Sequence, residues 1–448
     1  MTRTGRVFVA VVAVAVAAAA AVAVIALHRP EPVVSAALAQ RKADPHKGAY
    51  LASAGDCVAC HTAPGGKSFA GGLPFGTPVG TVFSTNITAD RDNGIGNYTL
   101  QDFIRLMRFG VARDGRRVYP AMPYTAYARV SDEDLQDLLA YLQQLPPINA
   151  VNRPIEASWP LSMRWPLALW NVAFHDDTPF QPDPNKSAVW NRGAYLVQGL
   201  GHCGTCHTPR GLALQEKDLT GRSNEFLSGG VLAGFSSTNL RGNNGSGLGS
   251  WTEQDIVDLL KTGRSTFSAV HGPMTEVVQD STQYIGDADL KAIAVYLKSL
   301  SPAPSDAQPG FEKSDATIQA FMDGSENAPG GRIFMDSCSA CHRLDGSGAG
   351  RGFPRLAGNA SVLNPNADSL IAIILQGNRL PSTEGAPSGL AMPAFGWRYN
   401  DADIAALATF VRTSWGNRAA GVGEEDVRRV RAQLAADQSA RRAASARD

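Results

Sequence analysis

The 448-residue chain carries no net charge and has no cysteine outside one short repeated motif. Lysine and arginine together number 41, and so do aspartate and glutamate, so the chain lacks the positive excess typical of nucleic-acid binding. Cysteine is scarce, with six residues in all. Because the repeated motif contains all six, none is left for a disulfide framework. The composition therefore argues against a nucleic-acid partner and against a disulfide-stapled fold.

The six cysteines form three Cys-x-x-Cys-His pentapeptides, at residues 57–61, 203–207 and 338–342. This pattern is typical of covalent haem attachment, in which two thiols bind the porphyrin and the adjacent histidine ligates the iron. The predicted attachment residues are Cys57, Cys60, Cys203, Cys206, Cys338 and Cys341, and the predicted proximal ligands are His61, His207 and His342. Structural zinc is the alternative, but it needs a fourth Cys or His beside each motif, and none is suitably placed.

The wide spacing of the motifs indicates separate domains rather than a solenoid repeat. Each motif follows a short segment with small and aromatic residues, and each unit closes with an amphipathic helical pattern that begins at a capping residue. A glycine in the first helix would let an aromatic residue of the last helix approach closely. We therefore expect an all-α protein of three small tandem domains, each a few helices around one haem, at residues 44–145, 188–301 and 328–416.

The first two domains share a further block that the third lacks. Residues 85–99 match residues 238–252 at a constant offset of 153 positions. In each copy the block ends in a threonine that we expect to cap a helix. Tyr98 and Trp251 precede this threonine and are candidate hydrogen-bond donors to a haem propionate, with simple packing as the alternative. The first two domains therefore form the closer pair.

A methionine lies between the middle and closing helices of each domain, in a segment with proline or glycine nearby. Met122, Met274 and Met392 are the predicted distal iron ligands, because methionine in this role stabilises ferrous iron. Filling of gaps in the core is the alternative use of methionine. In the second domain His271 is a rival ligand, although we expect it to be a solvent-facing loop residue.

Each proximal histidine is expected to donate its second ring N–H to a carbonyl group, which fixes the ring. In the third domain Pro354 is the expected acceptor, and in the first domain Pro74 is a candidate. The second domain offers no obvious counterpart.

Residues 1–39 are predicted to be a signal peptide or an N-terminal membrane anchor. Arg3 and Arg6 precede an uncharged run at positions 7–27, which is long enough to cross a bilayer. Its high alanine content and the Ala-x-Ala sequence at 37–39 favour cleavage, while a retained anchor stays open. Both interpretations imply export from the cytoplasm.

Three further segments lie outside the predicted domains. Residues 146–187 form a linker rich in proline and tryptophan, which is either a strap packed between domains or a docking face for a partner or lipid. Residues 302–327 form a second, polar linker. Residues 417–448 form a charged tail, for which solvation is the default expectation and contact with anionic lipid or a partner the alternative. A stripe of Val427, Val430 and Leu434 in this tail is compatible with a short helix.

The chain resembles the triple-haem cytochrome c subunit of bacterial membrane-bound, quinone-reducing dehydrogenases. The resemblance covers about residues 44–416 and rests on segments 84–88, 119–124, 201–211 and 392–397. It implies three covalent haem c groups in a subunit on the periplasmic side of the cytoplasmic membrane. The implied electron donor is a PQQ-, flavin- or molybdenum-containing dehydrogenase, with or without a small third subunit, and the implied acceptor is ubiquinone. Members serve alcohol, gluconate, sorbitol, fructose or aldehyde oxidation, and these motifs do not indicate which.

The main functional hypothesis is therefore an electron-transfer subunit that is not an enzyme on its own. A self-contained multi-haem redox enzyme is the first alternative, and it would need a haem with an open distal position. A carrier that feeds a terminal oxidase directly is the second. The sequence indicates neither the order and potentials of the haems nor the position of a quinone site.

Overall fold

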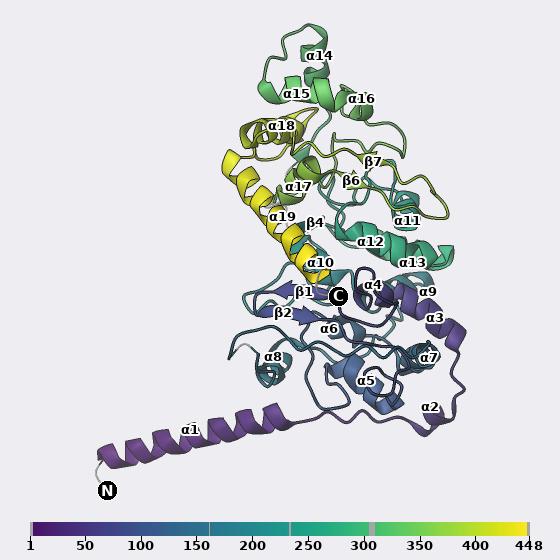
Figure 1. Cartoon of the computed structure of the whole chain (residues 1–448), viewed down its shortest axis with the longest axis vertical. Coiled ribbons are helices and arrows are strands. Elements are labelled where there is room, and N and C mark those ends of the chain that lie inside the picture. Colours follow the sequence, from purple (N-terminus) through teal and green to yellow (C-terminus); the bar gives the residue numbers. More distant parts are fainter. Residues whose placement is uncertain (1–2, 161, 233, 304–309, 446–448) are drawn as a thin grey trace. The chain divides into compact units, whose positions relative to one another are not determined.

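The computed structural model of the chain is predominantly helical (Figure 1). It describes residues 3–160, 162–232, 234–303 and 310–445. The chain divides into two compact units, Met1–Leu51 with Cys60–Gln181 and Ala52–Ala59 with Pro182–Asp448. The predicted all-α character is confirmed in the main, although short two-stranded antiparallel pieces accompany the helices. The predicted second and third domains both fall within the second unit.

The first part of the chain contains helices and one hairpin. The helices are α1 (Arg3–Leu27), α2 (Ala36–Gln40), α3 (Pro45–Ala54), α4 (Cys57–Cys60), α5 (Leu100–Phe109), α6 (Tyr124–Tyr127), α7 (Asp132–Leu142) and α8 (Pro166–Phe174). The hairpin joins β1 (Pro74–Thr77) to β2 (Gly80–Phe83), with Pro74 opposite Phe83. This hairpin carries the chain from the first Cys-x-x-Cys-His motif back towards residues 84–87.

The remainder of the chain repeats this mixture of helices and short strands. Its helices are α9 (Ala188–Gln198), α10 (Gly204–His207), α11 (Glu253–Thr262), α12 (Pro273–Asp280), the 3₁₀ turn η1 (Thr282–Tyr284), α13 (Asp287–Lys298), α14 (Ala316–Met322), α15 (Pro329–Ser337), α16 (Ser339–His342), α17 (Asp368–Gln376), α18 (Asp401–Thr413) and α19 (Glu424–Ser445). Its antiparallel pairs are β3 (Gly230–Leu232) with β4 (Phe235–Ser237), β5 (Gly310–Phe311) with β8 (Asn417–Arg418), and β6 (Asn378–Arg379) with β7 (Ala391–Met392).

A helix crossing at a glycine occurs three times, at α3 with α7, α9 with α13 and α15 with α18. A Cβ atom added to Gly48 would lie 2.0 Å from the Asp137 carbonyl oxygen and 2.7 Å from the Tyr141 Cβ. The same relation joins Gly193 to Ala292 and Tyr296, and Gly330 to Ala406 and Phe410. Only glycine lets the two backbones approach this closely. The expected approach of an aromatic residue to a glycine is therefore confirmed at all three crossings.

The helix starts follow the predicted capping residues. Thr99 and Thr252 each accept a hydrogen bond from the backbone N–H three residues later, and the aspartate at that position accepts one from the cap backbone N–H. These reciprocal bonds form capping boxes at α5 and α11. Ser131 and Asn400 cap α7 and α18 in the same way through their side chains. The capping bonds satisfy backbone donors that each helix start would otherwise leave unpaired.

The aromatic core around α15 and α18 extends over the C-terminal segment. Phe334, Phe410 and Trp415 pack with ring centroids 5.0–5.5 Å apart. Val427 and Val430 of α19 are buried in the same core, and Leu434 packs against it. Figure 1 shows α19 running beside α17 and α18. The predicted helix is confirmed, but α19 is 22 residues long and not short. The tail is not fully solvated either, because the first half of α19 belongs to this core.

Two charged contacts also fix α19. The Arg429 guanidinium donates to both carboxylate oxygens of Asp368, at 2.9 and 2.7 Å. Arg431 donates to Asp401 at 2.8 Å and to the Gly396 carbonyl at 2.7 Å. Paired charge-assisted bonds of this kind are stronger and more directional than single neutral bonds.

The two predicted linkers contain secondary structure. Helix α8 lies within the first one and packs beside α1. Trp159 and Trp165 of this linker are 79% and 45% exposed, so neither is sealed inside a strap. In the second linker Phe321 of α14 packs against Phe334 and Phe410. Among the residues that the structure describes, no helix is both long enough and apolar enough to span a membrane.

Side chains from residues 234–272 and 351–390 interlock within the second unit. The Ser236 backbone N–H donates to the Ser369 hydroxyl at 2.8 Å. The buried Arg264 donates to the carbonyl oxygens of Ala386 and Ser388, at 3.1 and 2.6 Å. Because these bonds use backbone groups on both sides, they fix the register of the two segments as well as their proximity.

We predict that Gly48→Ala destabilises the protein by about 2 kcal/mol, because its new methyl group has no room between α3 and α7. Alanine is otherwise the better helix former, so a purely local effect would have the opposite sign. Gly76→Ala is the matched control, since a Cβ there meets nothing within 4 Å. Urea unfolding followed by circular dichroism would measure both. Equal stability of the two variants would contradict the claim that the close approach of α3 and α7 excludes a side chain at position 48.

Candidate haem-binding sites

Each Cys-x-x-Cys-His motif folds into one short helical turn. The turns are α4, α10 and α16, and the first cysteine of the second and third motifs stands at the helix start. The His207 and His342 backbone N–H groups donate to the carbonyl oxygens of Cys203 and Cys338, at 3.0 and 2.9 Å. A spacing of three residues on one turn puts both thiols on the same face.

The three histidine rings make the same hydrogen bond. Nδ1 lies 2.6 Å from the Thr85 carbonyl oxygen in His61, 2.7 Å from that of Thr238 in His207, and 2.8 Å from that of Pro354 in His342. Because a carbonyl oxygen only accepts, Nδ1 carries the proton in each ring. Nε2 then presents its lone pair, which is the tautomer that an iron ligand requires.

The acceptors partly follow the prediction. Pro354 is confirmed in the third site, whereas Pro74 is wrong for the first, where Thr85 takes this role. Thr238 supplies the acceptor that sequence reasoning did not find for the second site. The signal was present, because both threonines begin the shared block of the first two domains. That block therefore has a definite task, to present a carbonyl to the proximal histidine.

A glycine with positive φ completes each site. The backbone N–H groups of Gly71, Gly229 and Gly348 donate to the carbonyl oxygens of the three histidines, at 2.8, 2.8 and 3.1 Å. Their φ angles are 76°, 100° and 69°, which lie in the region that favours glycine. A Cβ on Gly71 or Gly348 would lie 2.4 Å from Thr85 C or 2.7 Å from Pro354 C. These glycines therefore hold the histidine backbone and the acceptor peptide together.

Buried asparagines anchor the threonine loops. The Asn86 side chain accepts from the Thr88 backbone at 2.9 Å and donates to the Ile148 carbonyl at 2.6 Å. Asn239 accepts from the Arg241 backbone and donates to Asn243, both at 2.8 Å. Because each asparagine directly follows the accepting threonine, its bonds limit rotation of the peptide that carries the acceptor.

Burial sets the protonation of the site residues. It lowers the pKa of His61, His207 and His342, against the opposing effect of the carbonyl bond. The imidazoles are therefore neutral, as iron ligation requires. Burial raises the pKa of the Cys203 and Cys338 thiols to about 12, so neither is a ready thiolate.

These residues fit a covalently attached haem better than zinc. Among the described residues, no group of three or more His, Cys, Asp or Glu is placed to hold a metal ion, which leaves a zinc site without ligands. Buried guanidinium Nε atoms of Arg210, Arg264 and Arg355 have no hydrogen-bond partner. Such donors suit a cofactor that brings two propionate carboxylates. Haem would supply one-electron redox chemistry, and the chain would supply thiols, proximal ligand and donors.

The predicted distal methionines lie in comparable places. Met122 precedes α6, Met274 is the second residue of α12, and Met392 ends β7. All three are half-buried, as expected for a thioether at the wall of a cavity. Met392 and Cys338 pack against the same core. Their role as iron ligands stays a prediction.

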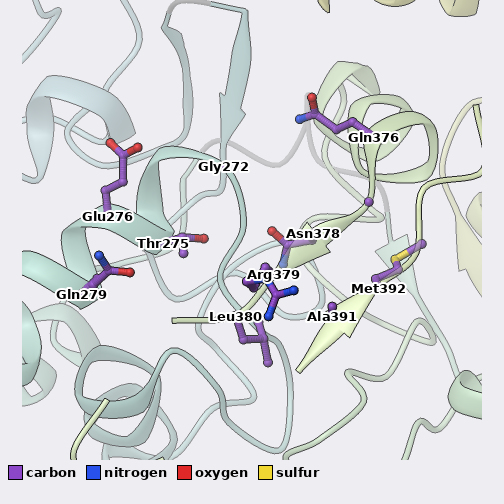
Figure 2. Close-up of a pocket in the computed structure, with 11 residues that line it drawn as sticks. Gly272, Thr275, Glu276, Gln279, Gln376, Asn378, Arg379, Leu380, Ala391 and Met392 are labelled. Atoms are coloured by element: carbon purple, nitrogen blue, oxygen red, sulfur yellow. The ribbon is translucent and has the colours of Figure 1, made fainter. Parts of the chain in front are cut away.

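A cavity of about 620 Å³ lies beside Met392, between α12 and the β6–β7 pair. Figure 2 shows Glu276 and Gln279 along α12, with Asn378, Arg379 and Met392 across from them. Its walls are mostly polar, whereas a porphyrin ring needs apolar walls. It is therefore a mostly polar recess next to the third site.

His271 and the two aromatic residues before the capping threonines are also located. His271 is half-buried rather than solvent-facing, and its Nε2 lies 3.1 Å from the Ser361 hydroxyl. Burial lowers its pKa to about 4. The Tyr98 hydroxyl accepts from the Arg113 backbone at 3.4 Å. Trp251 is buried and stacks on Phe267. Packing therefore accounts for part of the role of Trp251.

Asp56, directly before Cys57, is a buried acid in an unusual state. It is 7% exposed, its φ is 50°, and its Oδ1 has no hydrogen-bond partner. Burial raises the pKa of Asp56 to about 8, and the Asp280 and Glu276 carboxylates add to the rise. The side chain is therefore largely protonated at neutral pH. No sequence pattern had indicated it.

We predict that Gly348→Ala destabilises the third site by about 1–3 kcal/mol more than Gly350→Ala does. Both glycines have positive φ, so both variants incur a backbone cost of about 1–2 kcal/mol. Only the Gly348 methyl group would meet Phe353 O, at 2.3 Å, since a Cβ on Gly350 meets nothing within 4 Å. Urea unfolding would measure both. Equal losses would show that the contact with the acceptor loop is unimportant.

We also predict a pH-dependent gain from Asp56→Asn. The folded pKa of Asp56 lies above its ordinary value of about 4, so the folded state binds the extra proton and loses stability as the pH rises from about 4 to about 8. The variant should therefore gain stability over the wild type across this window and level off above it. Urea unfolding at several pH values would measure this. Asp92→Asn, at an exposed position, is the control, and a pH-independent difference would contradict the prediction.

The chain matches known proteins along most of its length. The cytochrome c family profile matches residues 45–146 and 327–415, which contain the first and third motifs. The gluconate 2-dehydrogenase cytochrome c subunit of Pantoea cypripedii is 47% identical over 408 residues, covering 88% of this chain and 92% of that protein. The cytochrome c subunit of the quinone-type alcohol dehydrogenase of Gluconobacter oxydans (strain 621H) is 43% identical, covering 86% and 81%.

The fructose dehydrogenase cytochrome subunit of Gluconobacter japonicus is 36% identical, covering 86% of this chain and 82% of that protein. These relatives are named for three different dehydrogenases, so the resemblance follows the subunit type rather than the substrate. The covalent attachment of haem c follows from the family and from the geometry of the motifs. The chain belongs to the family of cytochrome c subunits of dehydrogenases, which transfer electrons and are not themselves the catalytic subunits.

Proposed function

We propose that this chain carries electrons through three covalently bound haems from a partner dehydrogenase to ubiquinone. The observation that carries the proposal is the threefold recurrence of one arrangement. Each Cys-x-x-Cys-His turn is followed by a carbonyl that accepts from histidine Nδ1 and by a positive-φ glycine that bonds the histidine backbone. The three helix crossings at glycine support the same count of three small domains.

The proposal assigns iron ligands on both sides of each haem. His61, His207 and His342 are the proximal ligands, and Met122, Met274 and Met392 are the distal ones. With both axial positions filled by protein, such a haem exchanges electrons and does not bind substrate. The Nδ1 bond raises the electron density on each proximal ligand, which tunes the reduction potential.

The donor and acceptor are assigned from the family. The relatives are subunits of gluconate, alcohol and fructose dehydrogenases, and one name specifies the quinone type. We therefore assign a catalytic dehydrogenase subunit of PQQ, flavin or molybdenum type as donor and membrane ubiquinone as acceptor. The basic residues before the apolar segment at 7–27 support export, and we assign the subunit to the periplasmic side of the cytoplasmic membrane.

We predict three haems per chain in the protein purified from its bacterial membrane, and two in a Cys203→Ser/Cys206→Ser variant. Removing both thiols abolishes the thioether bonds of that site only. The pyridine haemochrome spectrum against protein concentration measures the count. An unchanged count in the variant would contradict covalent attachment at the second motif.

The electron route has its own measurement. The purified complex should reduce a water-soluble ubiquinone analogue when the partner's substrate is added, while the haem absorbance cycles between ferric and ferrous spectra. Carbon monoxide should bind the reduced protein slowly and below stoichiometry, since distal ligands must leave first. Rapid binding of one carbon monoxide per chain would favour a self-contained haem enzyme instead.

A further inference from the structure

Phe267, in the loop after α11, forms a bridge from the second Cys-x-x-Cys-His domain to the third. Its ring stacks on Trp251 with centroids 5.2 Å apart and planes 21° apart. The Arg355 guanidinium lies 4.2 Å from the centroid of the same ring. Phe267 therefore contacts an aromatic residue of its own domain and a cation of the next one. A guanidinium over an aromatic face is a favourable and directional contact.

A second contact joins the same two segments through their backbones. The buried Asn359 side chain donates to the Phe267 carbonyl at 3.2 Å and to the Arg355 carbonyl at 2.9 Å. One amide thus ties the loop of Phe267 to the residue that covers its ring. Two independent contacts at one point resist rotation of Arg355 about its own backbone.

Arg355 occupies a critical place because its backbone nitrogen belongs to the peptide unit that contains the Pro354 carbonyl. That carbonyl accepts the His342 Nδ1 proton at 2.8 Å. Proline has no N–H, so Pro354 cannot be anchored by a bond that it donates. The orientation of its carbonyl therefore depends on what fixes the neighbouring residues.

The first two sites anchor the acceptor peptide through an asparagine. There the residue after the acceptor is Asn86 or Asn239, each with side-chain bonds to nearby segments. In the third site the corresponding residue is Arg355, and its contacts reach Phe267. The third domain thus has local bonds, from Asn359 to the Arg355 carbonyl and from Arg355 to the Gly358 carbonyl, and adds to them a contact supplied by its neighbour.

We propose that Phe267 and Arg355 are positioning residues that set the reduction potential of the third haem by orienting the Pro354 carbonyl towards His342. The inference rests on the proposed third haem at residues 338–342. Under this proposal a residue of the second domain, Phe267, affects the reduction potential of the haem in the third domain. Neither residue is an iron ligand. Phe267 carries no charge and no propionate donor, so its variants separate the positioning of the carbonyl from the propionate contact open to the Arg355 Nε.

The direction of the effect follows from the chemistry of the hydrogen bond. A strong bond from Nδ1–H to a carbonyl increases the basicity of the imidazole and favours ferric iron. Weakening it should favour ferrous iron and raise the potential of the third haem. Loss of a nearby positive charge has the opposite effect, since a cation favours the less positive iron. Substitutions that keep the charge therefore separate the effect of the hydrogen bond on the potential from the effect of the positive charge.

The experiment is a spectroelectrochemical titration of the purified full-length protein carrying its haems. Phe267→Leu removes the ring and Arg355→Lys keeps the charge but loses the planar guanidinium, so both should raise the midpoint potential of the third haem. Phe267→Tyr keeps the ring and should leave this potential unchanged. Arg398→Gln is the control for charge, because Arg398 lies over Tyr399 and pairs with Asp336 in the same domain. It should not raise the potential.

The third haem is assigned by the redox step that a Cys338→Ser/Cys341→Ser variant loses. If that variant keeps every step, the third haem and hence the proposed function fail. If it loses one step, but Phe267→Leu or Arg355→Lys leaves the third potential at the wild-type value, only the positioning role is overturned. An equal rise of all three potentials would also overturn the positioning role. So would loss of the third haem from Phe267→Leu together with a wild-type potential of the third haem in Arg355→Lys.

Discussion

The hydrogen bond from each proximal histidine to a loop carbonyl is the interaction around which the three sites are organised. It fixes the tautomer, so that the other ring nitrogen is free for iron. The loop that supplies the carbonyl must pass close to the motif, and Gly71, Gly229 and Gly348 allow this by bonding the histidine backbone from a left-handed conformation. A side chain at Gly71 or Gly348 would collide with the acceptor peptide itself. The histidine can serve as an iron ligand in the correct tautomer only if the loop approaches the motif this closely.

The second requirement is the close crossing of the first and last helices of each repeated unit. At Gly48, Gly193 and Gly330 a backbone carbonyl of the opposite helix lies where the Cβ of any other residue would collide with it. The crossing holds the helix before the motif against the helix that closes the unit. It therefore determines where the short Cys-x-x-Cys-His turn starts. Both requirements are met by glycine, although for different reasons: one needs positive φ and the other needs space.

The third unit meets the same requirements with different residues. It uses a proline carbonyl where the others use threonine, and it takes part of its core from α14 and α19. Its acceptor loop is held by its own Asn359 and by Phe267 of the second unit, and the residue after the acceptor is an arginine instead of an asparagine. The block shared by the first two units therefore has a structural role, which is to anchor the acceptor carbonyl. The third unit lacks this block and anchors its carbonyl with other residues.

The sequence by itself determined the covalent chemistry, because the spacing of cysteine and histidine in the motif needs only one local helical turn. It also determined the helix caps at Thr99 and Thr252 and the acceptor Pro354, all of which depend on neighbouring residues. Only the tertiary structure decided that Thr85 and not Pro74 accepts from His61, that Val427 belongs to a core, and that Asp56 is buried beside other acids. These features depend on contacts between segments that lie far apart in the sequence. A local sequence pattern does not determine which of these contacts are energetically favourable.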